Sequence, residues 1–413
     1  MNPPMNETRQ GRGLMIAALC KITKVKNTWI VPSQSGKGRY TMQLESDSEY
    51  TRCSCPDYET NACKCKHIFA VEFAMLREEN VDGTTTVTEK VTLTATKRTT
   101  YRQNWPAYNE AQTNEKRQFQ ILLHDLCAAI ENPKPGKGRP TIPLSDAVFA
   151  VTFKIYSTFS GRRFISDLTD AQAKGHIGKV PHFNSIFNYL ENPDLTPILT
   201  ELIIRSSTPL KAVEVDFAVD STGFSTSRFV RWYDHKYGVV RQEHDWVKCH
   251  LMCGVKTNVV TSVEIHQRDA ADAPILPALV EATAKNFQIS EVSADKAYAS
   301  VDNLNAVAKC GGTPFIAFKS NHTGASGGLW EKMFHYFQFK RSEFLTHYHK
   351  RSNVESTINM IKAKFRDHVR SKTDVAMKNE VLCKILCHNI CCLISAMYEL
   401  KVVPTFPVLE NSK

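Results

Sequence analysis

Apolar residues recur at helical spacing through the second quarter of the chain. Between about residues 109 and 130, Phe119, Leu122 and Leu126 lie three or four positions apart, which predicts one buried helical face. This helix should end before the segment ENPKPGKGRP, because its prolines and glycines cannot continue a helix. The short periodic segments of residues 140–207, such as DAVFAVTFKIYSTF and TPILTELIIRSS, predict an all-helical region.

The pattern changes after Val213. The segments AVEVDFAVD, FVRWYDHKYG and WVKCHLMCGVKTNVVTSVEIH are rich in β-branched and aromatic residues, which is typical of strands. They are followed by a helical pattern in APILPALVEATAKNF, a strand in EVSAD, a helix closed by glycine in VDNLNAVAKCGG, a strand in PFIAFK and a final helix. This order predicts an α/β domain over residues 208–400, with a mixed five-stranded sheet and flanking helices.

The first 80 residues predict a small separate module. The segment RYTMQLES and the run up to Cys53 predict two strands, and KHIFAVEFAML predicts a helix, which together form a ββα unit. Residues 81–115 are rich in threonine and have little to bury, so we interpret them as a linker. The predicted organisation is completed by a helical region at 116–207, the α/β domain and a tail at 401–413.

Composition narrows the class of protein. A chain of 413 residues exceeds the roughly 250–300 residues of a single core, so two or three domains are expected. The formal net charge of +10 favours a polyanionic partner. The chain has no pattern of a signal peptide and no run of about 18 apolar residues, so no membrane span and a cytoplasmic location are expected.

Thirteen cysteines in a chain of this class indicate a reducing compartment and metal ligation. In the N-terminal module, Cys53 and Cys55 are followed by Cys65 and His67, and paired soft ligands separated by a loop suit tetrahedral Zn²⁺. Cys63 could replace Cys65 as the third ligand. The spacing resembles the SWIM zinc finger, C-x-C…C-x-H, which implies one structural zinc ion.

A second group of cysteines lies near the C-terminus in KILCHNICCLISAMYEL. Its members Cys383, Cys387, Cys391 and Cys392 include a stripe at helical spacing. We interpret the stripe as buried core, since free cysteine packs like a small hydrophobe. The alternative is a second metal site that includes His388.

Four residues near the C-terminus share one face of a predicted helix. Tyr348, Arg351, Glu355 and Lys362 are separated by three, four and seven positions, so they project into the same space. An acid among two cations and a phenol suits a carboxylate that holds a divalent metal while its neighbours hold phosphates.

Two earlier strand ends supply partner carboxylates, Asp220 in the segment DSTG and Asp295 in the segment DKAY. With these motifs the chain resembles the DDE transposases of the IS4/IS5-like group of bacterial and archaeal insertion sequences. That group carries Y-x2-R-x3-E-x6-K around its third acid, and this chain matches all four positions. Its D-S-T-G and D-K/R-A/G-Y motifs match the segments around the two aspartates.

The resemblance implies an RNase H-like catalytic domain in which Asp220, Asp295 and Glu355 hold two Mg²⁺ (or Mn²⁺) ions. It implies a DNA-contacting set: Tyr348, Arg351, Lys362, Lys296 and Arg366. It also implies a helix-turn-helix-like DNA-binding region at 116–207. The expected partners are double-stranded DNA, as transposon terminal inverted repeats and target DNA, and a second copy of the chain in a homodimer on that DNA. The location would be the nucleoid of a prokaryotic cytoplasm.

The expected reaction is metal-dependent cleavage at transposon ends followed by strand transfer. Trp330 is a further candidate, for stacking on a flipped base. Two alternatives stay open: a transposase-derived DNA-binding protein without cleavage, and an RNase H-fold nuclease without strand transfer.

Overall fold

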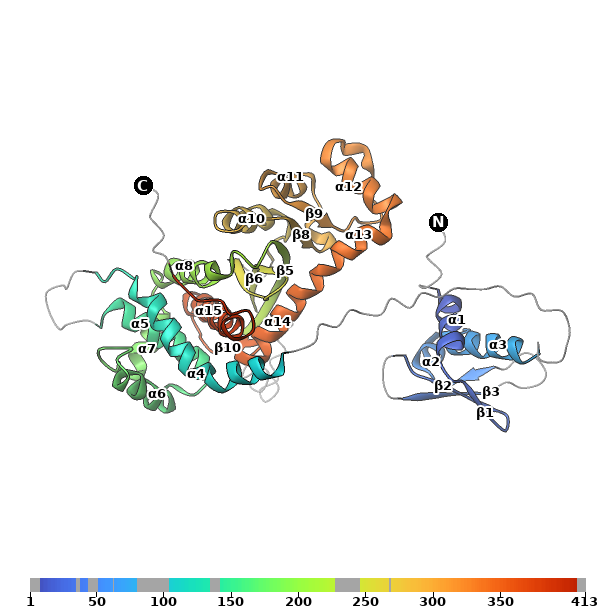
Figure 1. Ribbon diagram of the computed structural model, residues 1–413, viewed down its shortest axis with the longest axis horizontal. Coiled ribbons are helices and arrows are strands. Elements are labelled where there is room, and N and C mark those ends of the chain that lie inside the picture. The colour runs from blue at the N-terminus through green and yellow to red at the C-terminus, as the bar shows by residue number, and fades with distance from the viewer. Residues whose placement is uncertain are drawn as a thin grey trace, which may run out of the picture. The chain divides into compact units, whose positions relative to one another are not determined.

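The chain divides into two compact units, residues 1–101 and 102–413, and each is described by itself (Figure 1). The computed structural model describes residues 8–34, 38–43, 51–61, 63–79, 104–133, 142–226, 246–266 and 269–406.

The first unit is larger than the predicted ββα module. Its four strands pair antiparallel in chain order: β1 (Thr23–Val25), β2 (Thr28–Pro32), β3 (Arg39–Gln43) and β4 (Arg52–Cys53). Its helices are α1 (Arg9–Leu19), α2 (Pro56–Asn61) and α3 (Lys66–Glu79). The sequence predicted β3, β4 and α3 but not α1, β1 or β2.

Helix α1 packs closely against α3, and Gly13 makes this possible. A Cβ at position 13 would lie 2.5 Å from the Cβ of Phe69 and 2.8 Å from the carbonyl oxygen of Lys66. Real Cβ atoms essentially never approach other atoms so closely, so any side chain at position 13 would force the two helices apart.

The second unit begins with helices, as predicted: α4 (Trp105–Ala128), α5 (Leu144–Ser157), α6 (Gly161–Ala173), α7 (Phe183–Leu190) and α8 (Leu195–Ser207). The linker predicted to reach residue 115 ends earlier, because residues 105–115 already belong to α4. Asn104 explains this start, since its side chain accepts a hydrogen bond from the Ala107 backbone N–H and caps the helix. The rest of the predicted linker before residue 104 lies outside the described residues.

A mixed sheet follows: β5 (Asp216–Thr226), β6 (Trp246–Gly254), β7 (Val260–His266), β8 (Glu291–Ala294) and β9 (Thr313–Ile316). Their spatial order is β7-β6-β5-β8-β9; β5, β6 and β7 pair antiparallel, and β8 and β9 extend the sheet in parallel. A sixth strand, β10 (His368–Val369), pairs with the end of β5 and corrects the predicted count of five. The predicted strand segment FVRWYDHKYG (229–238) lies outside the described residues.

The remaining helices of this unit are α10 (Leu276–Ala284), α11 (Val301–Lys309), α12 (Gly328–Phe339), α13 (Arg341–Tyr348), α14 (Ser352–Phe365) and α15 (Asp374–Glu399). The stretch from Tyr348 to Lys362, predicted as one helix, is interrupted. A 3₁₀ turn at His349–Arg351 joins α13 to α14, so Glu355 and Lys362 lie on α14 while Tyr348 ends α13.

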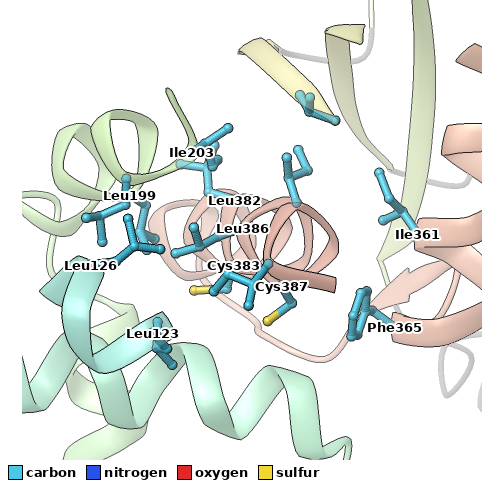
Figure 2. Close-up of a cluster of buried hydrophobic side chains, with 14 of the residues drawn as sticks. Leu123, Leu126, Leu199, Ile203, Ile361, Phe365, Leu382, Cys383, Leu386 and Cys387 are labelled. Atoms are coloured by element: carbon cyan, nitrogen blue, oxygen red, sulfur yellow. The ribbon is translucent and has the colours of Figure 1, made fainter. Parts of the chain in front are cut away.

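The helical region and one face of the sheet share a single hydrophobic core around α15. Figure 2 shows its Leu382 and Leu386 between Leu126 of α4, Leu199 of α8 and Ile361 of α14. The opposite face of the sheet is covered by α10, α11 and α12 through a second cluster. The boundary predicted at residue 207 therefore does not separate two independent cores.

Helix α15 confirms the interpretation of the C-terminal cysteine stripe as core, because Cys383 and Cys387 are fully buried (Figure 2). By length and composition α15 could cross a membrane, but 78% of its apolar window is buried inside the protein. The core helix of a soluble protein passes the same test of length and hydropathy.

Asn389 of α15 fastens the helical region to the sheet. Its amide nitrogen donates to the carbonyl oxygens of Ile203 and Val260, and its side-chain oxygen accepts from the Val260 N–H at 2.8 Å. Asn389 is fully buried, so these groups have no water to replace a lost partner.

We expect Asn389→Ala to lower the free energy of unfolding by about 2–4 kcal/mol, because it leaves buried backbone groups of Ile203 and Val260 unpaired. The measurement is the urea midpoint of the full chain. Asn305→Ala, at an exposed position on α11, is the matched control and should shift the free energy of unfolding by less than about 0.5 kcal/mol. Equal stability of the two variants would contradict the role of Asn389.

We also expect a histidine-dependent loss of stability in acid. Burial lowers the pKa of His388 to about 4, whereas an unfolded histidine titrates near 6.5. The unfolded state therefore binds more protons in this window, and stability should fall as the pH drops from about 6.5 to 4. His388→Gln can still donate to the Asn258 carbonyl and should flatten this slope in thermal melts. An unchanged slope would contradict the assignment.

Candidate active site and candidate metal centre

Three cysteines and a histidine of the first unit form a buried group. Cys53 ends β4, Cys55 precedes α2, and Cys65 and His67 lie at the start of α3. Their ligand atoms all lie within 4.8 Å of one another. Cys63 is outside this group, so the structure favours Cys65 as the third ligand.

The electrostatics of the group favour a thiolate. A hydrogen bond from Cys53 lowers the pKa of Cys65 to about 4, although burial opposes this. The same interaction raises the pKa of Cys53. The Nδ1 atom of His67 lies 3.9 Å from the Cys53 sulfur and 4.0 Å from the Cys65 sulfur. Three thiols and an imidazole are a donor set that could bind zinc, and their burial suits a structural ion rather than a catalytic one.

In the second unit, the register of the sheet brings two of the predicted acids together. β5 and β8 run parallel, and Val219 opposite Ala294 is the last pair of the ladder. The next residues are Asp220 and Asp295, so both carboxylates lie at the same level of neighbouring strands. Asp295 ends the extended segment and precedes a 3₁₀ turn at Lys296–Tyr298.

Arg351 connects the third predicted acid to the first. Its Nη1 donates to Asp220 at 3.2 Å, and its Nη2 donates to Glu355. The pKa of Asp220 is raised, chiefly by burial and further by the negative charges of Asp295 and Glu355, while Arg351 opposes the shift. The three acids predicted from the sequence therefore lie within electrostatic reach of one another.

Arg351 contacts carboxylates here, whereas the sequence predicted phosphate contacts for it. The three acids are less closely gathered than the metal-binding group of the first unit. Among the described residues, the group around Cys53 is the one whose ligand atoms all lie within 4.8 Å of one another. The guanidinium of Arg351 lies between Asp220 and Glu355 and neutralises part of their charge.

Lys350 was missed by the sequence reasoning. Its Nζ lies 2.7 Å from both Asp216 and Glu291, at the starts of β5 and β8, and His347 also binds Glu291 at 2.8 Å. These ion pairs fix the 3₁₀ turn that carries Arg351 to the sheet. They also account for Asp216, the acid that shares a strand face with Asp220. No sequence spacing could reveal them, because the partners lie far apart along the chain.

The second predicted acid is held by a buried tyrosine. Tyr298 is 1% exposed, and its hydroxyl lies 3.3 Å from Nδ1 of His250 on β6. Its carbonyl oxygen accepts a hydrogen bond from Asn303 of α11 at 2.7 Å. These contacts fix the turn that begins at Asp295.

The other predicted DNA-contacting residues differ in exposure. Lys296 is exposed, whereas Tyr348 and Lys362 are half-buried, and the Lys362 Nζ lies 5.5 Å from the centre of the Phe224 ring. Arg366 donates to the Thr158 carbonyl at 3.4 Å.

Trp330 is buried, and its indole N–H donates to the Thr323 carbonyl at 2.7 Å. It therefore has no free face for base stacking, contrary to the expectation from the sequence.

No curated protein and no solved structure matches the chain. Residues 211–390, which include all three acids and Arg351, match the family model described as the transposase DDE domain, and this match supports a DDE transposase.

Proposed function

We propose that the chain is a DDE transposase in which Asp220, Asp295 and Glu355 form the catalytic site. The observation that carries this proposal is their convergence from two strands and a helix. The parallel register sets Asp220 beside Asp295, and Arg351 bonds both Asp220 and Glu355. The mixed sheet and its helices fit the RNase H-like fold of such enzymes.

Carboxylate oxygens from separate elements are the ligands that Mg²⁺ or Mn²⁺ prefers. Asp220, Asp295 and Glu355 would hold two such ions, which supply activation of the attacking oxygen and stabilisation of the leaving oxygen. Arg351 binds Asp220 and Glu355 and so holds these two acids near each other. Lys350 holds the turn that carries Arg351 through Asp216 and Glu291.

In the proposed reaction, water attacks a phosphodiester at the transposon end and the 3′ oxygen leaves as a free hydroxyl. That 3′-OH then attacks a phosphodiester of the target strand and displaces its 3′ oxygen. No covalent bond between protein and DNA forms. Lys296 is exposed next to Asp295 and is placed to contact a phosphate, and Tyr348, Lys362 and Arg366 would complete the DNA contacts.

The finer assignments rest on sequence motifs. The Y-x2-R-x3-E-x6-K signature supports membership of the IS4/IS5-like group, with terminal inverted repeats and target DNA as substrates and a homodimer on the DNA. A location with the chromosome in a prokaryotic cytoplasm follows from this substrate. The group at Cys53 supports a SWIM-type module with one structural zinc ion.

The two alternatives are a DNA-binding protein without cleavage and an RNase H-fold nuclease without strand transfer. The convergence of three acids favours an enzyme over a binding protein. The basic residues around the third acid favour strand transfer over hydrolysis alone.

We expect Glu355→Gln to abolish cleavage while DNA binding is kept. The substitution keeps the shape but removes the charge that holds the metal, so cleavage should fall by about three or more orders of magnitude. The measurement is Mg²⁺-dependent nicking of a duplex that carries the sequences flanking the gene, together with gel-shift affinity for the same duplex. Affinity should be unchanged or slightly higher, because one negative charge near phosphates is removed.

Glu331→Gln, at an exposed acid on α12, is the matched control and should cleave like the wild type. If Glu355→Gln cleaves normally, α14 carries no catalytic acid and the proposal fails. If the wild type binds but never cleaves, the DNA-binding alternative replaces it. If the wild type cleaves but never joins the ends to target DNA, the alternative of a nuclease without strand transfer replaces the proposal.

The purified chain should carry about one zinc ion, bound by the group at Cys53. The double variant Cys53→Ser, Cys55→Ser should lose it, and the first unit should unfold because its metal ligands are confined to that unit. Elemental analysis of the full chain measures the metal, and limited proteolysis reports unfolding of residues 1–101. Cys63→Ser is the control and should keep zinc; loss of zinc in this control would show that Cys63 is a ligand.

A further inference from the structure

Two histidines and a glutamate lie on one face of the strands β6 and β7. These strands pair antiparallel, with Glu264 opposite His250 and His266 opposite Lys248. Residues opposite each other, and residues two positions apart on one strand, share a face of the sheet, so His250, Glu264 and His266 project from the same side. The centres of the two imidazole rings are 5.6 Å apart, and the rings are inclined at 77°.

The Nε2 atoms of both histidines lack a hydrogen-bond partner. In the part of the chain that the structure describes, both atoms are buried and neither makes a hydrogen bond. A buried polar atom without a partner costs free energy, so a ligand that binds both nitrogens would stabilise this face. Burial also lowers the pKa of His250 to about 4. The imidazole of His250 is therefore neutral at neutral pH, which is the form that binds metal ions.

The other ring nitrogen of His250 lies against oxygen atoms. Its Nδ1 is 3.3 Å from the hydroxyl of Tyr298 and 3.6 Å from Oδ1 of Asp272. A histidine that binds a metal through one nitrogen usually donates the proton of the other nitrogen to a carboxylate or another oxygen, which fixes the ring and its tautomer. A proton on Nδ1 leaves a free lone pair on Nε2. The charge of Asp272 is balanced by Lys248, whose Nζ lies 2.8 Å from it.

The spacing of these groups fits one ion bound by both rings. Tetrahedral Zn²⁺ binds imidazole nitrogen at about 2.0–2.1 Å, which places the centres of two such rings about 5 Å apart. The Oε2 atom of Glu264 lies 3.8 Å from Nε2 of His266, and two ligand atoms of such an ion are about 3.4 Å apart. The group is less closely gathered than the one at Cys53. The side chains of Glu264 and His266 are 46% and 33% exposed, so both can turn toward an ion that enters from solvent.

We propose that His250, His266 and Glu264 form a binding site for a divalent transition-metal ion such as Zn²⁺. Two imidazoles and one carboxylate suit this class of ion, whereas Mg²⁺ prefers oxygen ligands. Three protein ligands leave a fourth position for water. An ion there would fix His250, and with it the hydroxyl of Tyr298 in the turn that begins at Asp295. The site requires neither the three acids nor DNA, so it goes beyond the proposed function.

The test is a titration of the full chain with Co²⁺, which binds where Zn²⁺ binds and absorbs visible light. The chain is first loaded with one equivalent of Zn²⁺ for the thiolates at Cys53. The titration is done without DNA and in excess Mg²⁺, which occupies the three acids but binds imidazole poorly. The wild type should bind about one Co²⁺ per chain and show no charge-transfer band from thiolate to cobalt. Absence of binding, or binding only with a thiolate band, would overturn the inference.

His266→Ala should weaken Co²⁺ binding by at least about 100-fold and Glu264→Gln by about tenfold, because loss of a direct ligand costs at least as much as loss of an outer contact. Both side chains are partly exposed, so urea midpoints measured without metal should match the wild type. His335→Ala, at an exposed histidine on α12, is the matched control and should bind Co²⁺ like the wild type. So should Glu355→Gln.

Equal Co²⁺ affinity of His266→Ala and the wild type would overturn the inference. Loss of the ion in Glu355→Gln would also overturn it, because the ion would then belong to the three acids. Neither result depends on whether the chain cleaves DNA, so failure of this site and failure of the proposed transposase are distinguishable.

Discussion

The architecture of the second unit depends on one apolar helix that carries buried polar side chains. Helix α15 is hydrophobic enough to pass for a membrane span, yet Asn379, Lys384 and Asn389 are buried within it. Each one hydrogen-bonds a different backbone segment. Asn379 binds Leu190 and Asn192 at the end of α7, Lys384 binds Arg366 and His368 after α14, and Asn389 binds Ile203 of α8 and Val260 of β7. Apolar burial supplies the driving force, and these bonds fix the register of the elements around the helix.

The position of Glu355 follows from this arrangement. The Lys384 ammonium donates to the carbonyl oxygens of Arg366 and His368, directly after α14 ends. Arg366 has a φ of 76°, an unusual conformation for a residue with a side chain, and this turn aims the chain into β10 beside β5. The helix of the third acid is therefore fixed at its end by α15 and at its start by Lys350. Lys384 is buried and Lys350 is half-buried, and neither contacts Asp220, Asp295 or Glu355.

Much of the fold could be predicted from the sequence, because local patterns determine helices and strands. Contacts between residues far apart in the sequence could not be predicted in this way. Hydrophobic periodicity and turn residues are local features of the sequence. They correctly predicted the helices before β5, the strands β5 and β8, and the end of α11 at a glycine. The interruption at His349–Arg351 was missed, because the ion pairs of Lys350 with Asp216 and Glu291 are long-range and leave no periodic trace. The sixth strand, β10, is two residues long and exists only because β5 extends to meet it. The spacing of Asp220 and Asp295 became meaningful only once the parallel register was known.

The two adjacent basic residues of the 3₁₀ turn explain how the fold tolerates so many acids. Carboxylates that lie close together repel each other, which costs free energy. Arg351 offsets this cost for Asp220 and Glu355, and Lys350 offsets it for Asp216 and Glu291. Asp216 and Glu291 begin the neighbouring strands β5 and β8, whereas Asp220 lies in β5 and Glu355 in α14. The cations that balance these acids therefore also connect the sheet to the 3₁₀ turn and to α14. The acids of β5, β8 and α14 are thereby held near one another by cations of the protein itself.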